Sequence, residues 1–421
     1  MNPGAAPSGT GSGRHLDALE TRDPALRERD LLSRLPGQLG HAKSATAYYG
    51  KVLAGVDVAS VTSRAELARL PITRKSELLE LQKQDPPFGG LNATPPSGIA
   101  RIFMSPGPIY DPEGRHPDPW RGARPLFAAG FRAGDVAINC FSYHFSPAAC
   151  MFETGLHHIG CCVIPAGAGQ TEMQARAIHD LKPSGYAGTP SFLKIILEKC
   201  DELGLSAASL KRAVVSGEAF LPPVREFLAA RGLAAFQAYG TADLGLIAYE
   251  TDAHEGLVLD EELVLEIVRP GTGEPVAEGD VGEVVVTTFN RDYPLVRFAT
   301  GDLSAVLSGR SPCGRTNMRI KGWMGRADQT TKVRGLFIHP HQVAEVLRRH
   351  AAGRARLVVE NEGGEDRMTL RVEHRDPKDR TFSAALEASL RDVTKLRGEV
   401  HLEAAGSLPN DGKVIEDLRK Y

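Results

Sequence analysis

The sequence has no run of apolar residues that approaches the ~20 needed to span a bilayer, which excludes a membrane-spanning protein. Its first segment, MNPGAAPSGTGSGRH, lacks the apolar core of a signal peptide, and we interpret residues 1–15 as a disordered tail. The chain also carries no large excess of positive or negative charge. A formal net charge of −2 is not typical of a nucleic-acid-binding protein, which normally shows a basic face.

The six cysteines include no CxxC pair, and Cys161 and Cys162 are adjacent in an apolar run. Scattered cysteines of this kind are typical of a reduced environment, so we expect a cytoplasmic protein. The 421 residues, 42% hydrophobic and 24% charged, indicate a soluble globular chain of at least two domains. We expect a large domain over residues 16–325 and a small one over residues 326–421.

Strands and helices alternate along the middle of the large domain. β-like runs begin at Val136, Cys161, Tyr186, Arg212 and Ala235, and a helical pattern follows each of the first four. This alternation predicts an α/β fold with a mostly parallel sheet flanked by helices, in which ligands bind at the carboxyl ends of the strands. The segments just past those ends are 142–144, 167, 188–191, 216–219 and 239–245.

Other parts of the chain show different patterns. From Leu246 onward, short alternating runs predict a β-rich, antiparallel appendage to the large domain. In the small domain the expected order is β-α-β-β-α-β, beginning with a strand over Thr331–Phe337, which is typical of a ferredoxin-like α+β fold. Near the N-terminus, Thr73 is expected to cap a helix within Leu70–Gln82.

The segment SPGPIYDPEG (Ser105–Gly114) follows a short expected strand, where a phosphate-binding loop could lie. Small residues such as Ser105 and Gly107 allow backbone N–H groups to approach phosphate oxygens. The prolines of this segment remove donors, however, and it contains no lysine. An ordinary proline-rich turn is therefore the alternative interpretation.

A second candidate stretch is AYGTADLGLIAYE, residues 238–250. Tyr239 could lie against a purine ring, and Asp243 could hold a magnesium ion that bridges phosphates. Single residues of these types are common at strand ends, so Tyr239 could equally be a rim aromatic and Asp243 a turn acid. The residues alone leave both interpretations open.

Four motifs occur in a fixed order, namely AYGTADLG, VRFATGDLS, GRADQTTKVRG and NDGK, and LPITRKSEL and VSGEAF precede them. In this order the chain resembles the adenylate-forming (AMP-binding) acyl-CoA synthetase superfamily, and more closely its phenylacetate–CoA ligase-like branch. The resemblance covers roughly residues 65 to 418. It implies a small domain that acts as a mobile lid and an enzyme that adenylates a carboxylic acid with ATP and Mg²⁺. Thioester formation with coenzyme A then releases AMP.

The resemblance also implies roles for individual residues. Asp302 would accept hydrogen bonds from the ribose, Arg326 would contact phosphate, Asp328 would be the hinge, and Lys413 would reach the carboxylate and α-phosphate. The Gly335 region would replace Lys413 in the second step. Asp243 would hold Mg²⁺ in place of the usual glutamate. The nucleotide would contact Ser105, Gly107, Ser216, Gly217, Glu218, Ala219, Tyr239, Gly240, Thr241, Asp302 and Gly335.

The acid is expected near the end of the strand that begins at Val136. Phe141, Tyr143 and His144, together with Gly188, would suit a flat aryl acid, although packing of the aromatic side chains on the following helix is the alternative. Some relatives hold zinc with Cys and His residues. Here only His254 and Cys313 remain as vestigial ligands, and because a structural zinc takes four ligands we expect no zinc.

Three interpretations of function remain open at this point. The first is an aryl- or acyl-CoA ligase acting on a small carboxylic acid, for which the branch resemblance suggests a homodimer. The second is an adenylating enzyme with another acceptor, such as a carrier-protein thiol or an amine, or an enzyme that transfers the adenylyl group. The third is a non-catalytic binding homologue, which the altered phosphate loop motivates.

Overall fold

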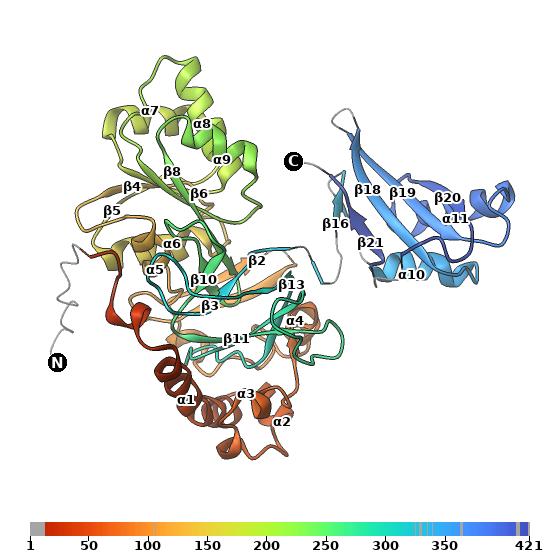
Figure 1. Ribbon diagram of the computed structural model, residues 1–421, viewed down its shortest axis with the longest axis horizontal. Coiled ribbons are helices and arrows are strands. Elements are labelled where there is room, and N and C mark those ends of the chain that lie inside the picture. The colour runs from red at the N-terminus through yellow and green to blue at the C-terminus, as the bar shows by residue number, and fades with distance from the viewer. Residues whose placement is uncertain are drawn as a thin grey trace. The chain divides into compact units, whose positions relative to one another are not determined.

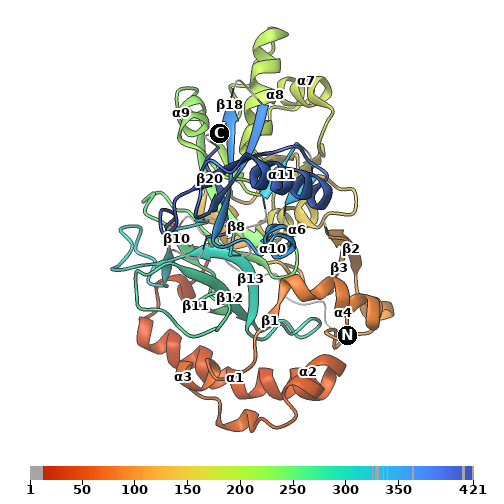
Figure 2. The same cartoon turned by 90° about the vertical axis from the view of Figure 1, so that its right-hand side faces the viewer.

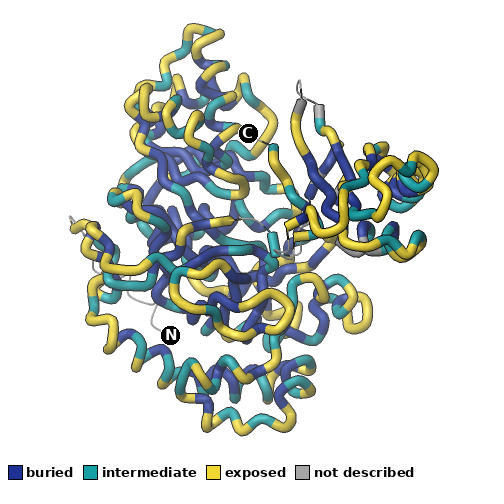
Figure 3. The backbone as a smooth tube through the Cα atoms, turned by 45° about the vertical axis from the view of Figure 1, so that its right-hand side comes forward, coloured by how far each residue is buried: buried dark blue, intermediate teal, exposed yellow. Residues whose placement is uncertain are grey.

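The structure is a computed structural model, and it describes residues 13–105, 107–324, 326–327, 331–334, 336–338, 340–362, 365–409 and 413–419. The chain divides into two compact units, Met1–Met324 and Gly325–Tyr421, which are described separately (Figure 1). In each unit the central strands are buried and the connecting segments are more exposed (Figure 3). Within the described part of the chain, no helix is both long and apolar enough to cross a membrane.

The large unit is built on a nine-stranded sheet with the order β14-β15-β10-β9-β8-β7-β6-β4-β5. Its parallel half confirms the predicted α/β fold. It consists of β4 (Val136–Asn139), β5 (Cys162–Pro165), β6 (Gly185–Gly188), β7 (Arg212–Val215) and β8 (Ala234–Thr241). The other half is antiparallel, with β9 (Gly245–Tyr249), β10 (Leu257–Leu259), β14 (Val306–Leu307) and β15 (Arg319–Ile320).

Helices cover both faces of the parallel strands. Leu126 of α5 (Ala123–Ala128) and Phe152 of α6 (Ala148–Ile159) share one buried cluster with Ala137 of β4. The helices on the opposite face are α7 (Thr171–Leu181), α8 (Pro190–Glu202) and α9 (Pro222–Ala229). Ile178 and Leu193 of these helices pack against Ile138 of β4 in a second cluster. Neighbouring residues of one strand thus face two different cores, and both faces of the parallel strands are covered.

A second sheet of the large unit has the order β1-β13-β12-β11. Its strands are β1 (Thr73–Arg74), β11 (Leu263–Val268), β12 (Gly282–Thr288) and β13 (Phe298–Ser304). The N-terminal helices α1 (Pro24–Ala45), α2 (Ala47–Val52), α3 (Arg64–Leu67) and α4 (Leu78–Gln84) lie beside it (Figure 2). Leu35 and Leu39 of α1 share its core with Val264 of β11. The predicted β-rich appendage therefore has a helical cover.

Thr73 is not a helix cap, which corrects the sequence-based expectation. It lies in β1, fully buried, where its hydroxyl is 3.1 Å from the Tyr49 hydroxyl, and β1 pairs in parallel with β13. A 3₁₀ turn over Lys75–Glu77 follows, and α4 begins only at Leu78. Pairing with a strand more than 200 positions away outweighed the local preference of a threonine before a helical pattern.

The expected phosphate loop is mostly a β-hairpin. Strand β2 (Arg101–Ser105) pairs antiparallel with β3 (Ile109–Glu113), so only the connection between them is a turn. Ser105 is buried and its hydroxyl donates to the Ile109 carbonyl oxygen at 3.4 Å. Alternation along β3 explains the difference, because Tyr110 is exposed whereas Ile109 and Asp111 are buried.

The small unit contains a four-stranded sheet with the order β20-β19-β18-β21. Its strands are β18 (Ala355–Glu362), β19 (Glu365–Glu373), β20 (Glu399–Glu403) and β21 (Ile415–Asp417). One face packs on α10 (Pro340–Arg349) and α11 (Arg380–Thr394), with Val346, Leu370 and Leu390 in its core. On the opposite face, Arg367 forms an ion pair with Glu399 at 2.8 Å and Arg371 pairs with Glu403.

The predicted β-α-β-β-α-β order is wrong in one respect. The segment expected as the first strand forms a separate two-stranded hairpin, β16 (Thr331–Val333) and β17 (Leu336–Ile338), which is not part of the four-stranded sheet. The fourth strand is instead β21, which pairs in parallel with β18. Arg334, with φ 47°, begins the reversal between β16 and β17, so this segment is too short to act as one continuous strand.

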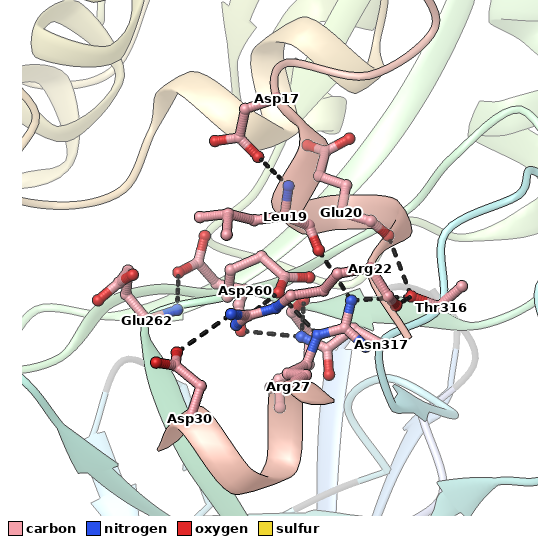
Figure 4. Close-up of polar contacts among 12 residues, drawn as sticks. Asp17, Leu19, Glu20, Arg22, Arg27, Asp30, Asp260, Glu262, Thr316 and Asn317 are labelled. Atoms are coloured by element: carbon pink, nitrogen blue, oxygen red, sulfur yellow. Dashed lines mark hydrogen bonds and ion pairs between the residues drawn. The ribbon is translucent and has the colours of Figure 1, made fainter. Parts of the chain in front are cut away.

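Hydrogen bonds and ion pairs join the N-terminal segment to the rest of the large unit (Figure 4). Arg27 of α1 donates to Glu261 at 2.7 Å, and Asp17 accepts from Arg124 at 2.7 Å. Glu20 is fully buried and 3.0 Å from Arg315. Residues 1–12 of the expected tail lie outside the described residues, whereas Arg14 already pairs with Asp252 at 2.6 Å.

Candidate active site

The ends of β8 and β13 bring a tyrosine and a carboxyl group together. The Tyr239 hydroxyl donates to Asp302 Oδ2 at 2.9 Å, and the Trp323 indole Nε1 donates to Asp302 Oδ1 at 3.1 Å. The backbone N–H of Asp302 donates to the Thr300 hydroxyl at 3.0 Å. Each carboxyl oxygen of Asp302 is therefore held by a donor, which fixes the orientation of the group.

Two glycines allow the sharp turn that follows Tyr239. Strand β8 has a bulge between Tyr239 and Gly240 where it pairs with β9. A side chain on Gly240 would come within 2.5 Å of the Gly245 carbonyl oxygen, and Gly245 itself has φ 76° and lies against Trp120. Because only glycine fits both positions, the chain can reverse within four residues and place Thr241 and Asp243 just past the strand end.

Asp243 lies in a buried polar cluster that the sequence did not predict. Its side chain is fully buried and accepts from Lys75 Nζ at 2.5 Å. Burial, followed by the nearby charge of Asp243, raises the pKa of Asp111 on β3 well above its ordinary range, although Lys75 opposes the shift. Burial and then Asp111 also raise the pKa of Tyr293. These four side chains therefore share one low-dielectric environment.

The ends of β6 and β7 form a second turn region. The Ser216 N–H donates to the Gly188 carbonyl oxygen at 3.2 Å, and Gly217 has φ 84°. Glu218 accepts from the Ser191 N–H at 2.7 Å, at the first turn of α8. A side chain on Gly217 would contact Phe141 at 3.8 Å. The structure thus places the predicted nucleotide turn, residues 216–219, beside one of the predicted substrate residues.

The aromatic residues past β4 have different surroundings. Phe141 is buried and stacks on Phe152 of α6 with ring centroids 4.7 Å apart. The Tyr143 hydroxyl donates to Glu153 of the same helix at 2.5 Å, and burial raises the pKa of Tyr143. His144 and Phe145 are both exposed, and Phe145 is 67% exposed. Phe141 and Tyr143 therefore pack on α6, the helix that follows them. This packing was the sequence-based alternative to a site for an aryl acid.

His254 and Cys313 make separate contacts. His254 Nδ1 is 3.1 Å from Glu250, and its ring stacks on Phe236. Cys313 is buried, with its sulfur 3.0 Å from the Ser311 hydroxyl. Burial acts to raise the pKa of Cys313, but hydrogen bonds from Ser311 and other neighbours outweigh it and lower the pKa. Among the residues that the structure describes, no three His, Cys, Asp or Glu side chains form a metal-binding group.

The remaining predicted site residues belong to the small unit. Lys413 Nζ is 3.6 Å from Glu416, and about half of the lysine side chain is exposed. Arg326 is partly buried. Asp328 and Gly335 lie outside the described residues, so the structure does not describe their geometry.

Sequence reasoning missed several members of these clusters. Lys75 lies within LPITRKSEL, which contributed only to the overall resemblance, and Tyr293 precedes β13 in a loop. Asp111 was interpreted as part of a turn. The sequence Ile109-Tyr110-Asp111 does not mark the aspartate as facing inward, because the aromatic Tyr110 is the exposed residue and Asp111 the buried one. For Trp323, the sequence contains no signal either.

Comparisons with known proteins identify relatives of this chain. A family model described as AMP-binding enzyme matches residues 121–290. A phenylacetate-coenzyme A ligase of Aromatoleum evansii is 30% identical over 361 residues, which cover 81% of this chain and 80% of that protein. A phenylacetate-coenzyme A ligase of Thermus thermophilus is 30% identical over 363 residues, covering 82% and 80%.

A solved structure is similar over nearly the whole chain. A 2-hydroxyisobutyryl-CoA ligase in complex with 2-HIB-AMP and CoA matches with a TM-score of 0.74 at 25% identity, covering 97% of this chain and 93% of that one. The fold and the family model together define the class as that of the AMP-binding enzymes. Within this class, the chain belongs to the phenylacetate–CoA ligase family.

Proposed function

We propose that the protein is an AMP-forming acid–thiol ligase. It would adenylate a carboxylic acid with ATP, releasing pyrophosphate, and transfer the acyl group to the thiol of coenzyme A, releasing AMP. The observation that carries this proposal is the 30% identity to two phenylacetate–CoA ligases over about four fifths of each chain. An aryl acid is the proposed substrate class, in keeping with those relatives.

The large unit supplies the groups for the nucleotide. Asp302 would accept hydrogen bonds from the ribose hydroxyls. Tyr239 and Trp323, which donate hydrogen bonds to its two oxygens, keep the carboxyl group in one orientation for this role. The turn at residues 216–219 would border the adenine with its exposed backbone. Pre-oriented groups of this kind place the α-phosphate for attack without further ordering, which lowers the barrier.

Mg²⁺ is part of the proposal, and the residues around Asp243 fit it. Carboxylate oxygens are the ligands that Mg²⁺ prefers, and Asp243 Oδ1 is buried without a hydrogen-bond partner among the described residues. Asp243 would hold the ion, which would supply positive charge to the phosphates of the nucleotide. Asp243 also binds Lys75, so this lysine must share or leave the carboxylate when the ion binds.

We assign Lys413 to the adenylation step, because a cation there would offset charge on the α-phosphate. Arg326 would contact phosphate, Asp328 would be the hinge, and the Gly335 region would serve the second step. A cytoplasmic location and a homodimer complete the proposal. All six cysteines are free thiols, which supports a reducing compartment, and light scattering would test the dimer.

Pyrophosphate release with Mg·ATP across a panel of aryl and aliphatic acids tests the function. We expect release with at least one aryl acid, and Lys413→Ala should slow it by about a hundredfold or more. The lysine is half exposed, so this variant should unfold at the wild-type temperature. If no acid drives release and calorimetry detects no ATP binding, the protein is a binding homologue and the proposal fails.

The acceptor is tested in the same assay. With coenzyme A present, AMP release should become multiple-turnover and an acyl-CoA thioester should accumulate. If the acyl-adenylate forms but coenzyme A changes neither quantity, the acceptor is another thiol or an amine.

A further inference from the structure

Four chain segments that lie far apart in the sequence meet around Asp243. Lys75 lies just after β1, Asp111 in the middle of β3, Asp243 in the turn after β8 and Tyr293 before β13. All four belong to the large unit, and Asp111, Asp243 and Tyr293 are each at least 95% buried. Lys75 is more exposed, with about a fifth of its side chain accessible. Two buried carboxyl groups and a buried phenol are thus grouped with one partly exposed lysine.

The buried groups of this cluster have unused hydrogen-bonding capacity. Among the described residues, both Asp111 oxygens, Asp243 Oδ1 and the Tyr293 hydroxyl are buried without a hydrogen-bond partner. Ser105 and Asp243 are close enough to influence the Asp111 carboxyl, but neither makes a hydrogen bond of good geometry to it. Buried polar groups in folded proteins are nearly always paired, so four such atoms in one place indicate a site for a ligand.

The chemistry of these atoms selects the kind of ligand. Three of the four are carboxyl oxygens, which repel anions and bind hard divalent cations. Lys75 offers only one positive charge to two carboxyl groups, and it contacts Asp243 through Oδ2. Asp111 and the second oxygen of Asp243 therefore face a position that needs positive charge. Tyr293 adds a hydroxyl that could donate to a water bound to such a cation.

We propose that Asp111 and Asp243 together hold the divalent cation that the nucleotide carries, with Asp111 as the second carboxylate ligand. This inference rests on the proposed function and extends it. A lysine in the segment 105–114 would bind phosphate directly, and that segment has none. Instead of a lysine, the β2–β3 hairpin presents the Asp111 carboxylate. The phosphate would then be held through the cation. Lys75, displaced from Asp243 by the cation, would also bind the phosphate.

Mn²⁺ binding to the full-length protein tests the proposal without any turnover. Free Mn²⁺ is counted from its electron paramagnetic resonance signal as protein is titrated. We expect one site in the wild type, a loss of affinity of about tenfold or more in Asp111→Asn and in Asp243→Asn, and no change in Asp201→Asn. Asp201 is an exposed aspartate of α8 and serves as the matched control. Wild-type affinity in Asp111→Asn, or no binding by the wild type at millimolar Mn²⁺, overturns the proposal.

Thermal unfolding separates a ligand from a structural residue. Without metal, Asp111→Asn removes a buried carboxyl that has no hydrogen-bond partner among the described residues, so the variant should melt no lower than the wild type. The rise in melting temperature on adding Mn²⁺ should disappear in this variant. A variant that melts several degrees lower and keeps the full Mn²⁺-induced rise would show a structural role and overturn the proposal.

The two proposals can fail separately. If Asp111→Asn keeps the wild-type Mn²⁺ affinity while the wild type forms an acyl-CoA, only the cation site is wrong. If Mn²⁺ binding depends on Asp111 but no acid drives pyrophosphate release, the cation site stands and the ligase function fails.

Discussion

Asp302 shows how one carboxyl group is prepared for a polar ligand. It is buried at the end of β13, with a phenol and an indole donating to its two oxygens. Tyr239→Phe removes one of these donors without changing the shape of the side chain. We expect a loss of about 1–3 kcal/mol in the free energy of unfolding, measured by urea denaturation, because a hydrogen bond to an acidic group is lost in a buried setting.

A matched variant tests whether burial sets the size of this effect. Trp323→Phe removes the other donor from a side chain that is 49% exposed, so the loss should be smaller than in Tyr239→Phe. Equal stability of the Tyr239→Phe protein and the wild type would contradict the role given to this hydrogen bond. In the ligase assay, Tyr239→Phe should raise the KM for ATP more than it lowers kcat, since Asp302 is assigned to binding.

The raised pKa of Asp260 predicts that the stability of the folded protein depends on pH. Burial raises its pKa to about 6, although Arg121 and Arg124 oppose the shift. A carboxyl group whose pKa is raised by folding stabilises the folded state below its unfolded pKa, and this contribution is lost as the pH rises through about 6. The melting temperature of the wild type relative to Asp260→Asn should therefore fall between pH 4 and pH 6. A constant difference over this range would show that Asp260 titrates normally.

The sequence predicted single residues well only where a motif fixed their place. Tyr239 and Gly240 were expected at a strand end and Asp302 was indicated by the resemblance alone, and the structure brings Tyr239 and Asp302 into contact. Lys75 and Asp111 gave no such signal, because their importance comes from a contact with Asp243 that is made across more than 130 residues of chain. A lysine after an arginine, or an aspartate before a proline, carries no local mark of such a pairing.

At the scale of elements, Asp366 helps to hold the β16–β17 hairpin in the small unit. Asp366 accepts from the Arg334 backbone N–H at 3.0 Å and from Arg419 at 3.0 Å. The hydrogen bond from Arg334, followed by the contact with Arg419, outweighs partial burial and lowers the pKa of Asp366. The hairpin and the segment after β21 are thus joined to the start of β19.

Asp366→Ala should loosen this hairpin. We expect faster hydrogen exchange at the amides of residues 331–334, and little change in the helices. The Asp392→Ala variant is the control, because Asp392 is an exposed aspartate of α11 that pairs with Arg349. In the wild type the same amides should begin to exchange faster as the pH, corrected for intrinsic exchange, falls through the lowered pKa. Unchanged exchange in Asp366→Ala would show that β-sheet pairing alone holds the hairpin.

Helices and parallel strands were predicted more accurately than hairpins. The alternation of strands and helices between Val136 and Tyr239 predicts a single arrangement, a parallel sheet, because each helix must cover the sheet formed by the strands that flank it. The segments 105–114 and 331–337 are short, and their pairing depends on partners that local pattern does not specify. In the first segment the expected turn contains strand β3, which pairs with β2, and in the second the expected single strand is a two-stranded hairpin.

At the scale of the whole molecule, the two units have separate cores. Leu370, Val346 and Leu390 pack together in the small unit, and none of them belongs to a cluster of the large unit. Leu370→Ala leaves a cavity in a fully buried position, which costs about 2–5 kcal/mol. Calorimetry should therefore show two transitions in the wild type, and the variant should lower only one of them.

The assignment of this shifted transition can be checked in the same scan. Leu35→Ala, in the core of the large unit, should lower the other transition and leave the first unchanged. A single transition that moves with either substitution would mean that the two units unfold as one cooperative body.

The paired charges on β19 and β20 have a consequence for handling the protein. Strand β20 lies at one edge of its sheet, where unpaired backbone groups can recruit a strand from another molecule. Its outward residues Glu399, His401 and Glu403 are all polar, and Arg367 and Arg371 hold the two glutamates in place. A second chain that docked there would have to desolvate this row of charges. The edge should thus resist amyloid-like growth, and concentrated samples should stay clear at neutral pH.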